Sequence, residues 1–247
     1  MEQDEKHIIG NLFEHWAYVG ERAGLLTTAP SYKAVMPAES DWPRRVFDVQ
    51  QPEALAHIAT QIREGLLPDA VTFTASVAEA LAAPLAAAGF QPKMSLQGMI
   101  IYLRENPPGE SPEHIRFALA GSEADAYTFA TIAEGSFNYR VDGAVVARLL
   151  GQENKIKVFI GTVDGRAACC GLIFYDEAGN AGLHFIGTLP DFRGKGLAAA
   201  MTTRLLQECV ADGKRYCVLH ASKAGLPIYT RLGFEPVKEV ITYAHTL

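Results

Sequence analysis

Apolar side chains recur at helical spacing near the start of the chain and in shorter alternating or unbroken runs after it. Ile8, Leu12, Trp16 and Val19 would share one face of a helix over residues 7–22. The same patterns give the other elements expected in the first part of the chain: strands over 33–36, 45–49, 71–74 and 96–103, and helices over 52–63 and 77–88.

The second part of the chain alternates between strands and helices. Ser122 and Asp125 approximate a capping pair at a helix start, and Asp164-Gly165 is typical of a two-residue hairpin turn. The expected elements are strands over 115–120, 155–163, 166–175, 183–189 and 216–220, helices over 122–134, 144–150 and from 197, and a short helix and a strand on either side of Gly233. This order predicts an α/β fold, with three layers around a mixed and mostly antiparallel sheet.

A proline-rich polar passage over residues 105–112 is typical of a linker between domains. We therefore expect two domains, residues 1–104 and 113–247. Gly89-Phe-Gln-Pro92 after one helix parallels Gly233-Phe-Glu-Pro236 after another, which would make the first domain a degenerate copy of the second. Gly-Phe is also a common way to end a helix, so both interpretations stay open.

Composition narrows the function classes. The net charge of −6, with no run of Lys and Arg, argues against a nucleic-acid surface. No apolar run has membrane length, and the first residues lack the layout of a signal peptide. The cysteines stand in apolar segments without metal-ligand spacing, so we expect buried free thiols in a cytoplasmic protein and no metal site.

Glycine and basic residues gather directly after the strand over 183–189. Gly194 and Gly196 let the backbone approach a bulky partner. A helix start directs unpaired N–H groups and the positive end of the helix dipole toward one point, and Arg193 and Lys195 add full charges there. The turn therefore predicts a phosphate-binding loop.

Three phosphate-binding patterns can be compared with this turn. The nucleoside-triphosphate pattern fails, because Leu189 stands at its first glycine and Gly196 follows the lysine. The dinucleotide pattern Gly-x-Gly-x-x-Ala fits residues 194–199, but no acidic residue ends the next strand to bind ribose hydroxyls. The third pattern, Arg/Gln-x-x-Gly-x-Gly/Ala, is met by Arg193, Gly196 and Ala198.

The third pattern resembles the acetyl-CoA pyrophosphate loop of the GNAT superfamily of N-acyltransferases. A motif after the strand over 216–220 resembles the same superfamily: a short helix that carries Tyr229 and ends on Leu232-Gly-Phe234. The resemblance covers residues 111–247 and implies a GNAT-like second domain beside a degenerate GNAT-like or substrate-wall domain over 1–104. It also implies an acetyl-CoA-dependent N-acetyltransferase that acetylates a primary amine of a small molecule or peptide by direct attack.

The resemblance further implies a role for each matched position. Backbone groups of the strand would bind the pantetheine arm, and N–H groups of the loop would bind the pyrophosphate. Tyr229 matches the tyrosine that protonates the leaving thiolate, although a tyrosine on a short helix can also serve packing alone. The implied acetyl-CoA-binding residues are Ile186, Gly187, Thr188, Arg193, Gly194, Lys195, Gly196, Leu197, Ala198 and Ser222.

The group that removes the amine proton stays open among His184, Glu134, Asp191 and water. The first domain and the loop over 136–142 are expected to wall the acceptor cleft. A second interpretation is a non-catalytic acyl-CoA-binding or regulatory module, which keeps the loop without transfer. Pairing of two copies is common in the family, so a homodimer fits the resemblance.

Overall fold

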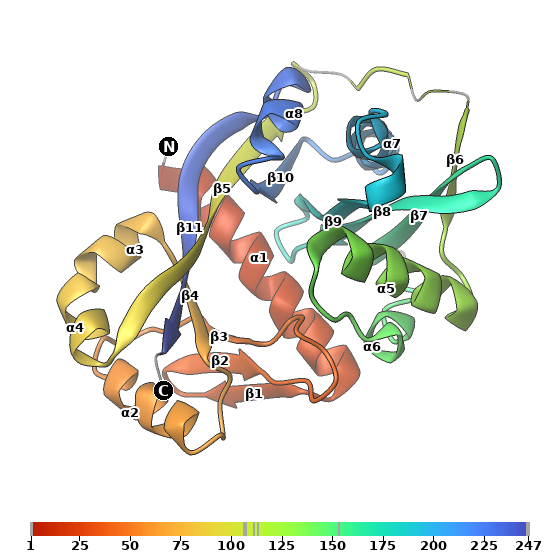
Figure 1. The fold of residues 1–247 in the computed structure, drawn as a ribbon. Helices are drawn as coiled ribbons and strands as arrows, with labels where there is room; N and C mark the ends of the chain where they lie inside the picture. Colours follow the sequence, from red (N-terminus) through yellow and green to blue (C-terminus); the bar gives the residue numbers. More distant parts are fainter. Residues whose placement is uncertain (1, 106–107, 111, 113, 153, 246–247) are drawn as a thin grey trace.

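A computed structural model describes residues 2–105, 108–110, 112, 114–152 and 154–245 (Figure 1). Its helices are α1 (Glu2–Ala23), α2 (Ala54–Arg63), α3 (Ala75–Ala80), α4 (Ala82–Ala87), α5 (Glu123–Phe137), α6 (Gly143–Ala147), α7 (Leu197–Ala211) and α8 (Leu226–Arg231), with a 3-10 turn at Pro190–Phe192. Its strands are β1 (Leu26–Ala29), β2 (Tyr32–Val35), β3 (Arg45–Phe47), β4 (Ala70–Thr74), β5 (Phe90–Tyr102), β6 (Ile115–Leu119), β7 (Ile156–Val163), β8 (Arg166–Tyr175), β9 (Ala181–Thr188), β10 (Tyr216–Ala221) and β11 (Glu235–His245).

All of these strands form one sheet in the order β1-β2-β3-β4-β11-β5-β10-β9-β8-β7-β6. Neighbouring strands are antiparallel except β3 with β4 and β9 with β10, which are parallel. The sequence prediction of a mixed and mostly antiparallel sheet is confirmed.

Helices cover both faces of the sheet, which makes three layers. Alternate residues of β10 separate the faces: Val218 packs in the cluster with Ile8 and Leu12 of α1, whereas Cys217 packs with Met201 of α7. Helices α5 and α6 pack on the α1 side of the sheet, and α8 lies on the α7 side. The long α1 runs across the middle of the sheet, behind β5 and β11 in Figure 1.

Strands from the two halves of the sequence are interleaved at the centre of the sheet. β5 of the first half lies between β10 and β11 of the second, and β11 lies between β4 and β5. The antiparallel pairing of β5 with β11 runs from Phe90↔His245 to Ile100↔Glu235. The strand after Gly89-Phe therefore pairs with the strand after Gly233-Phe, and each lies among strands of the other half of the sequence. The division into two domains stays a prediction, and residues 106–107 and 111 of the predicted linker lie outside the described residues.

Most predicted elements are present with shifted ends, and two expectations were wrong. The helix expected over 77–88 is two helices, α3 and α4, which meet at Leu81, and Pro84 in α4 has no N–H to extend a longer helix. β5 begins at Phe90 rather than at residue 96, because its exposed polar first half is held by pairing with β11. The capping pair is confirmed: the Asp125 N–H donates to Ser122 Oγ at 3.2 Å, and the Ser122 N–H donates to Asp125 Oδ2 at 2.9 Å.

Candidate active site

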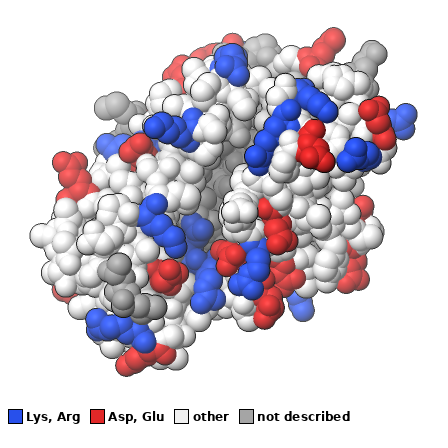
Figure 2. Space-filling view, viewed as in Figure 1, with Lys and Arg blue, Asp and Glu red and all other residues white. Residues whose placement is uncertain are grey.

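The parallel pairing of β9 with β10 stops early. It links Ala181 to Cys217, Gly182 to Val218 and Leu183 to Leu219, and then ends, although both strands continue. β9 also carries a bulge: Phe185 and Ile186 stand opposite a single residue of β8, and Phe185 has a φ of 55°. The two strands therefore diverge beyond Leu183, and Figure 2 shows the surface hollowed at this place, with Lys and Arg side chains on both sides of the hollow.

Backbone groups of β9 face the gap left by this divergence. The Leu189 N–H donates to Ala168 O on the β8 side at 3.0 Å, so alternation along the strand turns the peptide groups of Thr188 and Ile186 toward β10. The Thr188 hydroxyl oxygen is buried and has no partner among the described residues. The gap thus offers polar groups of Ile186 and Thr188 to an extended ligand, whereas Gly187 between them faces β8.

The turn after β9 is an open loop of backbone amides. Gly194 and Gly196 have φ values of 75° and 77°, which favour glycine, and a Cβ added at either would meet nothing within 4 Å. Helix α7 begins at Leu197 without a side-chain cap. In the described part of the chain, the N–H groups of residues 194–199 have no acceptor. These orphan donors are the grouping that binds phosphate at a helix start.

The basic residues of the loop differ in what they contact. Arg193 donates from Nη2 to Ser136 O at 3.0 Å and from Nε to Thr188 O at 3.4 Å, so its guanidinium joins the end of α5 to the end of β9. Lys195 is exposed, and its Nζ lies 5.3 Å from the centre of the Phe192 ring. Arg193 therefore braces the loop, and Lys195 contributes charge at its surface.

Helix α7 is seated on a glycine of β8. A Cβ at Gly171 would lie 2.9 Å from Leu205 Cδ1 and 2.9 Å from Met201 Cγ. This close approach fixes the height of α7 over the sheet, and with it the position of the amides at its start.

Tyr229 and Ser222 lie on or near α8. Tyr229 is buried against the α7 side of the sheet, and burial raises its pKa to about 12, so its hydroxyl stays protonated at neutral pH. Among the described residues, burial is the sole cause of this shift, and no charged neighbour adds to it. Ser222 Oγ accepts from the Gly225 N–H at 3.2 Å and thus holds the turn into α8.

Three histidine rings meet where β9 and β10 diverge, on the α1 side of the sheet. His184 directly follows Leu183, the last residue of β9 that pairs with β10. The centre of the His184 ring lies 4.0 Å from that of His15 of α1 and 6.5 Å from that of His220 of β10. Burial lowers the pKa of His15 to about 3 and that of His220 to about 4, and it lowers the pKa of His184 well below the ordinary value. All three rings are therefore neutral at pH 7.

A short hydrogen-bond chain fixes the orientation of His184. Asn11 Nδ2 donates to Asp176 Oδ2 at 3.1 Å, because a carboxylate can only accept, and this turns Asn11 Oδ1 toward His184 Nε2 at 3.1 Å. His184 Nε2 must then carry the proton, so Nδ1 is an acceptor, and it has no partner in the described part of the chain. The sequence analysis missed Asn11, His15 and Asp176, although Asn11 and His15 interrupt the apolar face of α1 at helical spacing.

The first half of the chain contacts the loop after α5 on this side. The Asp41 N–H donates to Arg140 O at 2.9 Å, and the Arg140 N–H donates to Asp41 Oδ2 at 2.9 Å. Trp42 then packs edge-on against Phe185 with ring centres 4.5 Å apart, and Tyr139 lies 6.5 Å from Phe185. These segments form an aromatic wall beside the histidines, and they belong to the two parts of the chain that the sequence predicted to wall the acceptor cleft.

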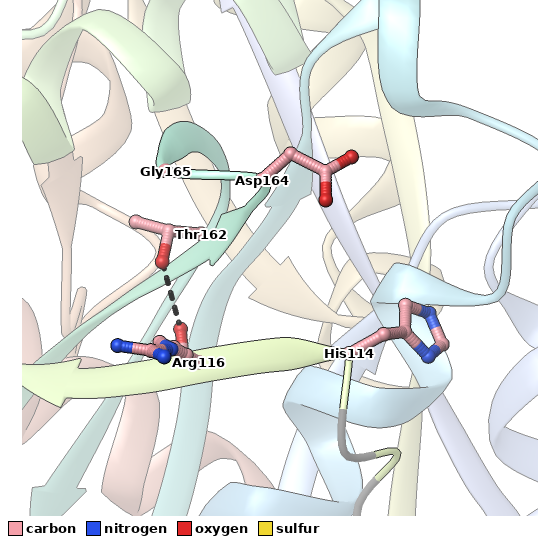
Figure 3. A pocket seen from close by; sticks show the side chains of 5 residues that line it. All are labelled: His114, Arg116, Thr162, Asp164 and Gly165. Atoms are coloured by element: carbon pink, nitrogen blue, oxygen red, sulfur yellow. Dashed lines mark hydrogen bonds between the residues drawn. The ribbon is translucent and has the colours of Figure 1, made fainter.

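The other residues considered for removing the amine proton, Glu134 and Asp191, lie on the surface rather than in the histidine cluster. Glu134 is exposed on α5, and Asp191 is an exposed partner of Arg166 at 4.0 Å. A hollow of about 350 Å³ at the edge strand β6 is lined by His114, Arg116, Thr162, Asp164 and Gly165 (Figure 3), and it contains none of the predicted site residues.

Comparison with known proteins identifies the second half of the chain. Residues 125–246 match the family model described as an acetyltransferase (GNAT) domain. The C-terminal half of the chain belongs to the GNAT acetyltransferases. None of the curated proteins matches the sequence.

Solved structures extend the GNAT fold over the whole chain. A GCN5-related N-acetyltransferase from Kribbella flavida has a TM-score of 0.70 and 17% identity, with 97% of this chain and 96% of that one covered. A putative GNAT-family acetyltransferase from Novosphingobium aromaticivorans has a TM-score of 0.60 and 16% identity, with 97% of each chain covered. A tandem GNAT protein of the clavulanic acid biosynthesis pathway has a TM-score of 0.60 and 13% identity, with 86% of this chain and 77% of that one covered.

Two further findings concern the described residues of this GNAT protein. No described helix combines the length and apolar composition that crossing a bilayer requires. The described His, Cys, Asp and Glu side chains include no group of three arranged to hold a metal ion.

Proposed function

We propose that this protein is an N-acetyltransferase, which moves an acetyl group from acetyl-CoA to a primary amine. One observation carries the proposal: the gap between β9 and β10 opens beside a loop whose N–H groups have no acceptor in the described residues. A diphosphate at that loop and an extended arm along β9 would satisfy both sets of groups.

Acetyl-CoA fits the donor groups present. The N–H groups of residues 194–199 would bind its diphosphate with Lys195, and the Ile186 peptide groups and the Thr188 N–H would bind its arm, since the Thr188 carbonyl accepts from Arg193. Gly194 and Gly196 keep the space over the loop open. Bound acetyl-CoA supplies an acetyl group activated as a thioester.

Tyr229 and His184 would handle the protons. The Tyr229 hydroxyl, protonated because its pKa is raised to about 12, would donate to the departing sulfur. The nitrogen of the amine becomes strongly acidic as its bond to carbon forms, so a neutral imidazole with a free Nδ1, as in His184, can accept its proton. The two groups approach the gap from opposite faces of the sheet.

Turnover of a broad panel of amines, measured as free thiol released from acetyl-CoA, tests the proposal. Tyr229→Phe should lower kcat by roughly 100-fold, the lower range for general acid catalysis, while the Kd for acetyl-CoA stays unchanged. His184→Gln in the same assay should lower kcat to a similar extent, and undiminished turnover would assign the amine proton to water. Undiminished turnover by Tyr229→Phe would remove this residue from the mechanism.

The panel also decides between an enzyme and a binding module. If acetyl-CoA binds but no amine releases thiol, the chain is an acyl-CoA-binding or regulatory module. The free and buried cysteines support a reducing compartment such as the cytoplasm for either activity.

A further inference from the structure

Arg45, the first residue of β3, carries a guanidinium that packs over an aromatic ring of α1. Its Cζ lies 4.2 Å from the centre of the Trp16 ring. Its Nε is fully enclosed and has no hydrogen-bond partner in the described part of the chain. Nη1 and Nη2 also lack a described partner but are not enclosed, so the outer edge of the guanidinium reaches solvent.

No acidic group compensates this charge among the described residues. Burial lowers the pKa of Arg45 to about 10, and the neighbour that acts in the opposite sense is the Tyr139 phenol, which is neutral at pH 7. Arg45 therefore remains charged in the fold. Arg44, in contrast, donates from Nη1 to Pro37 O at 2.9 Å. A guanidinium that is largely enclosed and has no acidic or hydrogen-bonding partner among the described residues is costly, and its contact with Trp16 offsets only part of that cost.

Arg45 lies on the α1 side of the sheet, as the histidine rings do. It is close enough to His15 to contribute to the low pKa of that ring, and the His15 ring centre is 4.0 Å from that of His184. Tyr139, the other neighbour of Arg45, belongs to the aromatic wall around Phe185. The groups around the guanidinium are thus Trp16 and His15 from α1 and Tyr139 from the loop after α5, all of them uncharged at neutral pH.

We propose that Arg45 binds the carboxylate of the amine acceptor, so that the substrate class is a primary amine with a carboxylate on a small apolar or aromatic body, as in an amino acid. A guanidinium edge matches a carboxylate with two parallel hydrogen bonds. One guanidinium among neutral groups balances one negative charge, which favours a carboxylate over a doubly charged phosphate. The assignment of this anion to the acceptor rests on the proposed acetyl transfer.

Stability separates this role from a structural one. Arg45→Met keeps the length of the side chain and removes the unpaired charge, so its Tm without ligand should equal or exceed that of the wild type. A lower Tm would show that the guanidinium stabilises the fold through its contact with Trp16, and would overturn the proposal.

Kinetics test the substrate class with matched acceptors: phenylalanine, phenylalaninamide, 2-phenylethylamine and the aminophosphonate analogue of phenylalanine, each assayed by thiol release from acetyl-CoA. The wild type should favour phenylalanine over its amide by roughly 10- to 100-fold in kcat/KM, the range for a hydrogen bond to a charged group. Arg45→Met should remove this preference, and Arg45→Lys should keep part of it. Arg116→Gln removes a charge at the distant β6 edge and should retain the full preference.

Equal kcat/KM for phenylalanine and its amide in the wild type, or a preference kept by Arg45→Met, would overturn the proposal. A preference for the aminophosphonate would assign the site to a phosphate-bearing amine instead. If no acceptor turns over, calorimetry with N-acetylphenylalanine still decides: binding to the wild type that Arg45→Met loses supports the site, and equal or absent binding overturns it. Failure of turnover with such binding intact would refute acetyl transfer and leave the anion site standing.

Discussion

At the scale of single residues, the cluster of His15, His184 and His220 destabilises the fold through buried nitrogens unpaired among the described residues and keeps the His184 ring neutral. His15 has neither ring nitrogen bonded within the described residues, and His220 is in the same state. Their enclosure keeps the rings neutral, which is the form in which His184 beside them can accept a proton. The fold therefore loses stability at low pH, because protonation of these rings favours the unfolded chain.

The stability of the fold should depend on pH through these histidines. Histidines whose pKa in the fold lies below the ordinary 6.5 bind protons more readily when unfolded, so stability falls as pH drops from about 6.5 toward the lowered value of about 4 for His220. Each buried histidine should contribute a slope of about 1.4 kcal/mol per pH unit in this window. Replacing His15 with Phe, which suits its aromatic neighbours, should flatten the slope by that amount in urea unfolding at several pH values. An unchanged slope would show that His15 is already protonated in the fold.

From the sequence, the glycines and Tyr229 could be proposed as site residues, but not the polar groups around His184. Gly194 and Gly196 were expected because they leave room for a bulky partner, and their positive φ values add a second, conformational reason for glycine there. Asn11 and Asp176 are far apart in the sequence, and their hydrogen bond joins α1 to the end of β8. Nothing local to either residue indicates that partnership, which depends on the tertiary fold.

At the scale of elements, the position of α7 decides where the phosphate-binding amides lie. The sequence predicted the strand, the turn and the helix start, because Pro190 and the two glycines carry local signals. The bulge at Phe185 and the glycine beneath α7 carried no such signal, since both are required by packing against other elements.

A side chain at Gly171 should therefore weaken binding from a distance. In Gly171→Val the added carbons meet Leu205 and Met201 at about 2.9 Å, so α7 must shift away from β8. We expect the free energy of unfolding to fall by about 1–3 kcal/mol, and the Kd for acetyl-CoA to rise, as seen by urea unfolding and calorimetry. Leu205→Ala in the same chain makes room and should restore part of both losses. Full acetyl-CoA affinity in Gly171→Val alone would show that the seat of α7 is irrelevant to the loop.

At the scale of the whole molecule, the two halves share one sheet. The sequence left open whether Gly89-Phe and Gly233-Phe mark a repeated unit or are two ordinary helix endings, and the structure pairs the strands that follow them. The exchange of β5 and β11 between the halves could not be predicted, because alternation along a strand says which face is buried but not which strand lies beside it.

Because the strands are interleaved, we expect that the predicted second domain, residues 113–247, does not fold without the first. A fragment of residues 113–247 lacks β5, which leaves β10 and β11 without the strand between them. We expect such a fragment to aggregate or to melt without a cooperative transition, followed by circular dichroism. A fragment of residues 90–247 restores β5 and should gain order. A cooperative melt by the shorter fragment would mean that residues 113–247 form an independent domain.

The central claim is that the open amides after β9 bind the diphosphate of acetyl-CoA, and titration calorimetry tests it most directly. Asp and Asn both tolerate a positive φ, and the space over Gly194 is open, so Gly194→Asp and Gly194→Asn should both fold. They differ only in charge. We predict that Gly194→Asn binds acetyl-CoA within a few-fold of the wild type, whereas the carboxylate of Gly194→Asp repels the diphosphate and raises the Kd at least 10-fold. Equal affinity of the two variants, or a wild type that does not bind acetyl-CoA, would contradict the account.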